Sequence, residues 1–507
     1  MNQRKAGVIL SYLNTGASSI IALVYIPLLL HYLTKDQYGI YQLMGSLIAY
    51  LSVMDFGLAN TTTRYLSQAY AQHNQSRARA IIGTSRALYL VIAGILLAVG
   101  GIGYFFITPL YGKTLSPADL IVAKQIFLLM LVNISITIPS HIFTAAINAH
   151  EKFIFLRGLG LVKILLQPLL VWGILSLKAS VLNLVLVQTG FNLFVILLNY
   201  FYCKTRLHVS FPLDFTDKPL MKELTGFSVF IFLHAIMDQV YWRLGQVVLG
   251  ATSGAAAVAT YAIAMQVATF SILLPANMSG VFLPKLSALA AHGDNMAEID
   301  AIFCKVGRLQ FMLLMLIITG FAFLGKAFLA LWVGPGYSMC YALVLIVMAG
   351  YILDATQTVG IPILQALKKH AFRAYVYISM AALNVELCIV LGKRYGEIGC
   401  ACATAVCLWI GSGLVINWYY AHIGLNLKRF FINLGSILKG IVPAVLLIQG
   451  VFYFFPLRAA WISFVWHGVV LTGIYALCLW GIAFNSYERQ LLGNLLTRIL
   501  PRAKKAK

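Results

Sequence analysis

The stretch LTKDQYGIYQLMGSLIAYLSVMDFGLANTTTRYLSQA, residues 33–69, shows the pattern that decides the fold. Its middle part, residues 40–62, is mostly apolar, with Lys35 and Asp36 before it and Arg64 after it. A helix of about 20 apolar residues crosses a ~30 Å hydrocarbon core, and charges at its ends can stay in water. The stretch therefore predicts one membrane-spanning helix.

Similar apolar runs recur along the whole chain. Hydrophobic residues make up 61% of the sequence and charged residues 10%, which is outside the range of soluble domains. Fourteen spans are predicted, near residues 7–31, 40–62, 81–108, 122–147, 155–177, 180–203, 223–250, 256–283, 303–332, 338–366, 372–392, 398–421, 431–454 and 459–483. The expected fold class is an all-α polytopic membrane protein.

The basic residues indicate the orientation of these spans. With fourteen spans, 28 of the 37 Lys and Arg residues fall on one side, eight on the other, and Arg243 lies within a span. Basic residues are enriched on the cytoplasmic side of membrane proteins. The sequence therefore predicts a multi-pass protein of the bacterial cytoplasmic membrane with both termini in the cytoplasm. Lys393 and Arg394 are the clear local exception.

Composition also limits the function classes. The net charge of +22 is spread over many segments beside helix ends, so anionic lipids account for it and nucleic acid is not expected as a partner. The eight cysteines lack the His or Cys partners of a metal site, and reduced, buried thiols are expected. The first apolar run reads as a span, not a cleavable signal. No loop is large enough for a catalytic domain, so we expect no enzyme and no cofactor.

An internal repeat divides the chain. The strings RYLSQAYAQHNQ (residues 64–75) and PKLSALAAHGDN (residues 284–295) align at an offset of 220, which also pairs Tyr41 with Tyr261 and His150 with His370. Six spans separate the copies, so the two copies have the same orientation in the membrane. This is the parallel-repeat arrangement of many transporters, which can enclose a central cavity.

The repeat predicts two six-helix lobes joined by a Pro-containing linker. The expected boundaries are 1–203 for the first lobe, 204–222 for a cytoplasmic linker, 223–425 for the second lobe, 426–483 for two additional helices and 484–507 for a basic cytoplasmic tail.

The opening stretch resembles a known signature. A "yG.y" turn before the second helix and a "D.Gl......R" string after it are typical of bacterial polysaccharide-repeat flippases. AIMDQVYWRLGQVVLGATSGAAAVATYAIA (residues 235–264) and VFLPKLSAL (residues 281–289) resemble later segments of the same family. The resemblance implies the fold of the multidrug/oligosaccharidyl-lipid/polysaccharide exporters, which is shared with the MATE transporters. It also implies movement of undecaprenyl-pyrophosphate-linked sugar units to the outer leaflet, alongside polymerases and glycosyltransferases of the same pathway.

Polar residues within spans mark a candidate substrate site. A charge near the bilayer centre costs about 2.5–3.5 kcal/mol, so each one calls for a reason. In the seventh predicted span, His234 and Asp238 share one face, and Gln239, Arg243 and Gln246 share an adjacent face. The fork of Arg243 suits a pyrophosphate, with Gln239, His234 and Arg64 as further candidates. Alternatively, Arg243 neutralises Asp238, and Arg64 is an interfacial anchor.

Four intramembrane carboxylates are candidates for coupling transport to a proton or sodium gradient: Asp55, Asp238, Asp354 and Glu386. Desolvation brings carboxylates of this kind into the physiological titration range. The same groups can instead be polar contacts that join helices. A cation-coupled multidrug or metabolite exporter on the same fold is the alternative function, and Arg243 favours the anionic cargo.

Overall fold

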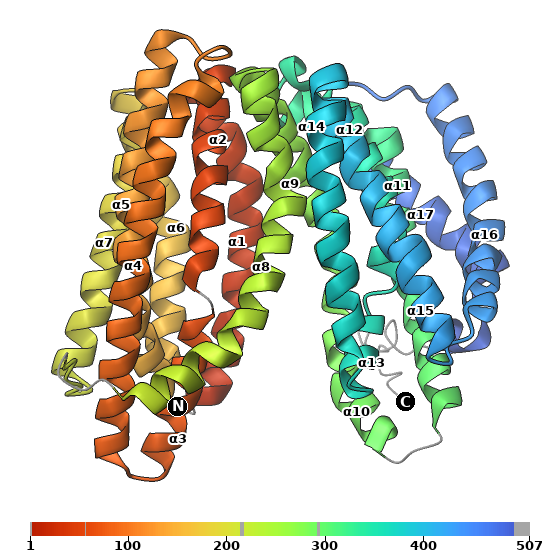
Figure 1. Ribbon diagram of the computed structural model, residues 1–507. Helices are drawn as coiled ribbons and strands as arrows, with labels where there is room; N and C mark the ends of the chain where they lie inside the picture. Colours follow the sequence, from red (N-terminus) through yellow and green to blue (C-terminus); the bar gives the residue numbers. More distant parts are fainter. Residues whose placement is uncertain (1–2, 56, 213–216, 292–294, 491–507) are drawn as a thin grey trace, which may run out of the picture. The chain divides into compact units, whose positions relative to one another are not determined.

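The computed structural model describes residues 3–55, 57–212, 217–291 and 295–490, apart from the side chains of residues 4, 5, 218, 223, 225–234, 274, 276, 277 and 370. Throughout these residues the chain is helical and has no strand (Figure 1). A chain this apolar has to satisfy its backbone hydrogen bonds internally within lipid, and an α-helix does so within one segment.

The chain divides into two compact units. The first comprises residues Met1–Ala262 together with Val385–Cys400, and the second comprises Ile263–Asn384 together with Ala401–Lys507. The boundaries expected for the two lobes stay a prediction. In the structure, α8 packs within the first unit, against α2, α3 and α4.

The helices of the first unit are α1 (Gln3–Tyr32), α2 (Lys35–Ser52), the 3₁₀ turn η1 (Val53–Asp55), α3 (Leu58–Ala71), α4 (Gln75–Tyr111), α5 (Pro117–Ala149), α6 (Phe153–Leu177), α7 (Val181–Thr205), α8 (Lys218–Thr252) and the start of α9 (Ala255–Asn277). Local sequence fixes where they begin. At α2, Thr34 accepts a hydrogen bond from the Gln37 amide at 3.2 Å, and Gln37 bonds back to the Thr34 amide. This reciprocal pair satisfies two amides at the helix start.

The second unit contains the rest of α9, η2 (Gly280–Phe282), α10 (Leu283–Ala291), α11 (Met296–Trp332), η3 (Pro335–Tyr337), α12 (Cys340–Thr356), α13 (Gly360–Ala366), α14 (His370–Leu408) apart from Val385–Cys400, the π-helix η4 (Trp409–Val415), α15 (Ile416–His422), α16 (Leu427–Phe454), α17 (Trp461–Cys478) and the π-helix η5 (Leu479–Ala483). Its core contains the stacked rings of Phe303 and Phe430, with Tyr420 edge-on to Phe303.

Twelve helical segments of the described residues are long and apolar enough to cross a membrane. Two differences separate this number from the fourteen predicted spans. First, α8 is not among the twelve, because the number refers to the described residues and the apolar part of α8 at 223 and 225–234 lies outside them. Second, Ala371–His422 counts as one segment of 52 residues.

That long segment reverses direction at Gly396. Its φ of 57° and ψ of −134° are not helical, and φ in this range favours glycine. The thiol of Cys388 lies 3.8 Å from the Cys400 carbonyl oxygen, and the Cys400 thiol lies 3.8 Å from the Cys388 carbonyl oxygen. In one straight helix, 12 residues would separate these positions by about 18 Å. Two antiparallel helices therefore stand where the sequence predicts spans 372–392 and 398–421.

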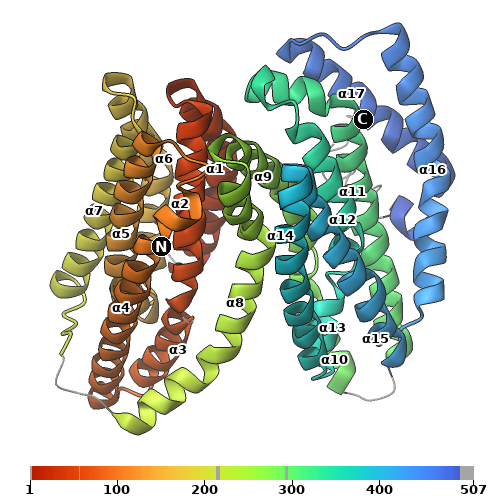
Figure 2. The same ribbon diagram turned by 45° about the horizontal axis from the view of Figure 1, so that its top comes forward.

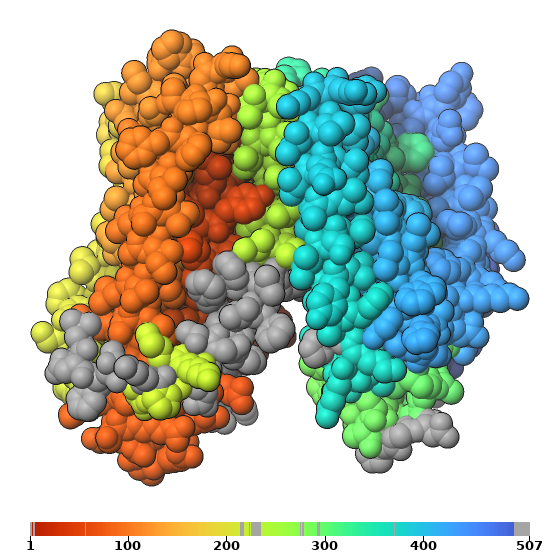
Figure 3. Space-filling model, in the orientation of Figure 1, coloured from red at the N-terminus to blue at the C-terminus, as the bar shows by residue number. Residues whose placement is uncertain are grey.

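The outer surface of the first unit is suited to lipid. Large apolar side chains are exposed along α4, among them Leu90, Ile102 and Phe105, and Phe105 is 75% exposed. Figure 3 shows α4 and α5, in orange, covering one face of this unit. Extensive exposed apolar surface is rare on soluble monomers, so the protein is a membrane protein.

A helix break recurs in both units. In the first, η1 and Gly57 interrupt the path from α2 to α3. In the second, η2 interrupts the path from α9 to α10. The following helices, α4 and α11, each contain 37 residues. The sequence repeat thus corresponds to a repeated helix, break and helix pattern, and the two breaks hold different polar side chains.

Candidate functional site

A stripe of polar side chains runs along one face of α2. Tyr38, Gln42, Ser46 and Tyr50 are four residues apart and so share a face. The Gln42 amide donates to the Tyr38 hydroxyl at 2.7 Å, and Ser46 donates to the Gln42 carbonyl at 2.8 Å. Ser46 is fully buried. The stripe therefore forms part of the interior of the first unit.

Helix α8 packs on this stripe (Figures 1 and 2). The Ser46 hydroxyl is hydrogen-bonded to the side-chain amide of Gln246, which is 2% exposed. Gly250 faces Leu43 so closely that a Cβ atom there would approach the Leu43 methyl groups to 2.6–2.7 Å. A small residue at this position allows the close approach of α8 that brings Arg243 to α2.

Arg243 is half-buried and lies near hydroxyl groups. Among the described residues, the groups that act electrostatically on its guanidinium are the hydroxyls of Tyr41, Tyr38 and Tyr50, and no carboxylate is among them. We call these four residues the Arg243–tyrosine cluster. Its positive charge is thus only partly solvated and faces neutral donors.

The cluster connects to α1 and α7 through Gln188. The Gln188 amide donates to the Tyr25 hydroxyl at 3.0 Å, and the Tyr41 hydroxyl donates to Gln188 Oε1 at 3.2 Å. Gln188 of α7 therefore holds the hydroxyls of Tyr25 on α1 and Tyr41 on α2 in place. A guanidinium beside fixed hydroxyl donors is suited to bind a phosphate-type anion, because each group can donate to its oxygens.

The other residues predicted for the substrate site are placed as follows. Gln239 and Asp238 are half-buried on α8, and Asp238 has an interaction of its own. Arg64 is exposed near the middle of α3. The side chain of His234 lies outside the described residues. Binding by Arg243, Gln239, His234 and Arg64 remains a prediction.

Asp55 lies at the break between α2 and α3, where it contacts His141 of α5. Its Oδ1 atom is 3.1 Å from His141 Nδ1, and the two side chains are 21% and 34% exposed. Tyr89 of α4 places its ring edge-on to the His141 ring at 6.4 Å. Asp55 thus has a titratable partner from a neighbouring helix.

The break in the second unit has neutral partners instead. Nε2 of Gln310 on α11 lies 2.9 Å from the Pro275 carbonyl oxygen, 2.8 Å from Ser279 Oγ and 2.7 Å from Thr358 Oγ1. Tyr89 and Gln310 are each the fifteenth residue of their helix, α4 and α11 respectively. The repeat is therefore asymmetric in chemistry: in the described residues, the acid and histidine are found at the first break.

Asp354, a predicted coupling residue, belongs to a buried ion pair of the second unit. Its Oδ1 atom is 3.1 Å from Arg373 Nη2, and it also accepts from Tyr377 at 2.7 Å and from Ser412 at 2.8 Å. The π-helix η4 carries Ser412. Glu386 of α14, by contrast, is exposed.

Two basic residues that were not predicted as site residues have polar partners in the structure. Lys163 of α6 donates to Asn192 of α7 at 3.3 Å, and Asn192 donates to Asn133 and Thr137 of α5. Arg308 of α11 is 5% exposed and pairs with Glu488. Their distance from the start of the helix could have indicated from the sequence that they lie within it. Lys163, for example, follows Phe153 by ten residues, or about 15 Å.

Comparisons with known proteins agree with this architecture. The model of the family described as "Polysaccharide biosynthesis protein" matches residues 5–290, more than half of the chain. The chain is 24% identical over 489 residues to "Uncharacterized membrane protein EpsK" of Bacillus subtilis (strain 168), covering 92% of each. It is 22% identical over 419 residues to "Putative O-antigen transporter" of Shigella flexneri, covering 80% of this chain and 94% of the relative.

Two groups of solved structures have the same fold. The lipid II flippase MurJ, in an inward closed conformation, matches with a TM-score of 0.67 and 16% identity, covering 96% of this chain and 100% of the other. An inward-facing multidrug resistance MATE family transporter of the MOP superfamily matches with a TM-score of 0.66 and 12% identity, covering 80% and 94%. The predicted fold class is therefore confirmed, and the chain belongs to the polysaccharide biosynthesis protein family.

Proposed function

We propose that the protein is a flippase that moves undecaprenyl-pyrophosphate-linked oligosaccharide repeat units from the cytoplasmic to the outer leaflet of the bacterial inner membrane. It does so by alternating access, without chemical change of its cargo. Its partners are the lipid-linked oligosaccharide, the surrounding lipids, and the polymerase and glycosyltransferases of the same pathway. Family membership supports this proposal, as does the likeness to EpsK and to the Shigella protein.

One observation carries the choice of cargo. Arg243 lies on α8, in the seventh predicted span, and the described groups that act on it are tyrosine hydroxyls. A half-buried cation that has no acid partner among the described residues attracts an anion and repels a cationic drug. The guanidinium can donate two parallel hydrogen bonds to a pyrophosphate, and the tyrosine hydroxyls add single donors. The exporter alternative lacks a comparable observation in its favour.

Substitution of Arg243 tests this role. In a bacterial strain that depends on this protein for surface polysaccharide, Arg243→Gln should lower surface polysaccharide by at least about tenfold, since hydrogen bonds to charged groups contribute ~1.5–3 kcal/mol. Arg243→Lys should retain part of the activity, because it keeps the charge and loses the fork. The matched control is Arg458→Gln, which removes an exposed charge from the loop between α16 and α17. This variant should stay active.

Normal polysaccharide export by Arg243→Gln, at equal protein abundance in the membrane, would overturn the assignment. Retention of polysaccharide export together with loss of resistance to a cationic drug would favour the exporter alternative.

For energy coupling, we propose a proton or sodium gradient acting through Asp55, Asp238, Asp354 and Glu386. Asp55 is the strongest candidate of the four, because His141 beside it offers a second titratable group in a half-buried position. Asp354 differs, because Arg373 compensates its charge. Each carboxylate should be changed to its amide while transport is measured with and without the gradient. If all four variants keep the gradient dependence of the wild-type protein, the idea fails.

A further inference from the structure

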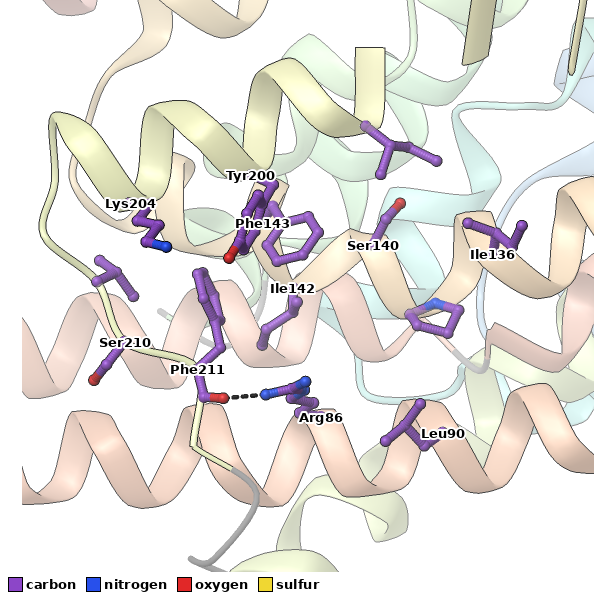
Figure 4. Close-up of a pocket in the computed structure, with 13 residues that line it drawn as sticks. Arg86, Leu90, Ile136, Ser140, Ile142, Phe143, Tyr200, Lys204, Ser210 and Phe211 are labelled. Carbon is purple, nitrogen blue, oxygen red and sulfur yellow. Dashed lines mark hydrogen bonds between the residues drawn. The ribbon is translucent and has the colours of Figure 1, made fainter. Parts of the chain in front are cut away.

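A separate pocket of about 430 Å³ lies in the first unit, between α4, α5, α7 and the segment after α7. Its volume falls within the ~300–1,000 Å³ typical of small-molecule sites. None of the residues that line it belongs to the Arg243–tyrosine cluster. Figure 4 shows Arg86 and Lys204 reaching this pocket from α4 and α7, with Phe211 between them.

The pocket is positively charged. Arg86 donates from Nη1 to the Phe211 carbonyl oxygen, and its other N–H groups have no partner in the described part of the chain. Lys204 is exposed, and its ammonium likewise has no partner among those residues. The lining contains no Asp or Glu. Two cations in a lining without an acid favour an anionic ligand there.

The rest of the lining is amphipathic. Phe143 lies edge-on to Tyr200 at 5.4 Å and to Phe211 at 5.0 Å, which forms an aromatic wall. Leu90 and Ile136 line the other part and are 47% and 40% exposed. Such exposed apolar residues on the outer face of a membrane protein can contact an acyl chain, while aromatic residues are typical of the membrane–water interface.

We propose that this pocket binds the phosphate headgroup of an anionic phospholipid of the cytoplasmic leaflet. Arg86 and Lys204 hold the phosphate, and the acyl chains lie along Leu90 and Ile136. Basic pockets between helices on the cytoplasmic side bind lipid headgroups in this way. The compact volume suits a single headgroup better than a pyrophosphate with its attached sugars. The site is thus distinct from the cargo site, and its test does not depend on the proposed function.

Native mass spectrometry of the purified full chain with phosphatidylglycerol tests the proposal. The wild-type protein should retain one phosphatidylglycerol in preference to phosphatidylcholine. Arg86→Gln combined with Lys204→Gln should lower the lipid-bound fraction by roughly tenfold, because each basic residue near the surface adds to the attraction. Lys204→Gln alone, at an exposed position that threatens folding little, should cause a smaller loss of the same kind.

A matched control comes from the same helix. Arg77→Gln combined with Arg79→Gln removes two exposed charges near the start of α4 and should leave phosphatidylglycerol binding unchanged. Equal losses in both double variants would show general attraction and overturn the proposal. Equal binding of phosphatidylcholine would also overturn it. Farnesyl pyrophosphate distinguishes the two sources of lipid phosphate: if it binds in an Arg86- and Lys204-dependent manner while phosphatidylglycerol does not, the site belongs to the polyprenyl cargo.

Discussion

At the scale of single residues, three arginines whose side chains are buried or half-buried have different surroundings. In the second unit, Arg308 and Arg373 each pair with a carboxylate. In the first unit, Arg243 lies among tyrosine hydroxyls. A buried pair satisfies its own charges, whereas a cation beside neutral donors is better satisfied when an anion binds. We therefore infer that Arg308 and Arg373 stabilise the structure, and that the charge of Arg243 is available to bind an anionic ligand.

The pair of Arg308 and Glu488 gives a stability prediction. Arg308 Nε is 2.7 Å from Glu488 Oε1, and Nη2 is 3.1 Å from Oε2; both side chains are at most 7% exposed. Arg308 also donates to the Asn433 and Ala483 carbonyls. Because Glu488→Gln leaves a buried guanidinium without its counter-charge, it should destabilise the protein by about 3–5 kcal/mol. The midpoint of thermal unfolding in detergent measures this loss.

The control for that prediction is the exposed pair of Lys285 and Glu298, whose atoms are 3.1 Å apart and whose side chains are 58% and 50% exposed. Glu298→Gln should cost less than about 1 kcal/mol, because water screens an exposed pair. If Glu488→Gln melts at the wild-type temperature, the buried pair does not stabilise the attachment of α16 and the C-terminal segment to α11.

At the scale of elements, the apolar runs were sufficient to predict the helices, because lipid imposes a fixed span length and internal backbone hydrogen bonds. The breaks at η1 and η2 were not predicted, because polar groups from other helices stabilise them. Gln310, for example, is 31 residues from Ser279 and 48 from Thr358. Partners such as His141 for Asp55 were missed for the same reason: they are far apart in sequence. Arg243, by contrast, could be predicted from the sequence, because it is a charged residue within an apolar predicted span.

The hairpin at Gly396 gives a prediction at the element scale. In a protein whose other cysteines are replaced, Cys388 and Cys400 should form a disulfide on treatment with iodine, because the reversal brings their thiols together. Intact mass with a loss of two hydrogens, and protection from a maleimide, measure the reaction. The control is the pair Cys400 and Cys407, seven residues apart on one helix and so separated by about 10 Å.

If Cys388 and Cys400 do not crosslink, the segment does not reverse at Gly396. A crosslink between Cys400 and Cys407 would show that the reaction does not report proximity. The variant Gly396→Ala gives a second measurement. An alanine is strained at a φ of 57°, so this change should lower the melting temperature more than Gly94→Ala, where a Cβ atom meets nothing within 4 Å.

At the scale of the whole molecule, the hairpin determines which side of the membrane the later loops face. If α8 and both halves of the 371–422 segment cross the bilayer, the chain has fourteen crossings, and the loop that carries Arg458 is outside. If α8 does not cross, or if the 371–422 segment crosses only once, that loop is inside.

With fourteen crossings, impermeant maleimide added to intact cells should label Lys113→Cys, Lys178→Cys and Arg458→Cys in a cysteine-free protein. It should label Gln72→Cys only after permeabilisation. All four positions are exposed. Labelling of Arg458→Cys only after permeabilisation, with Lys113→Cys and Lys178→Cys labelled in intact cells, would contradict fourteen crossings and would locate the error between residues 178 and 458.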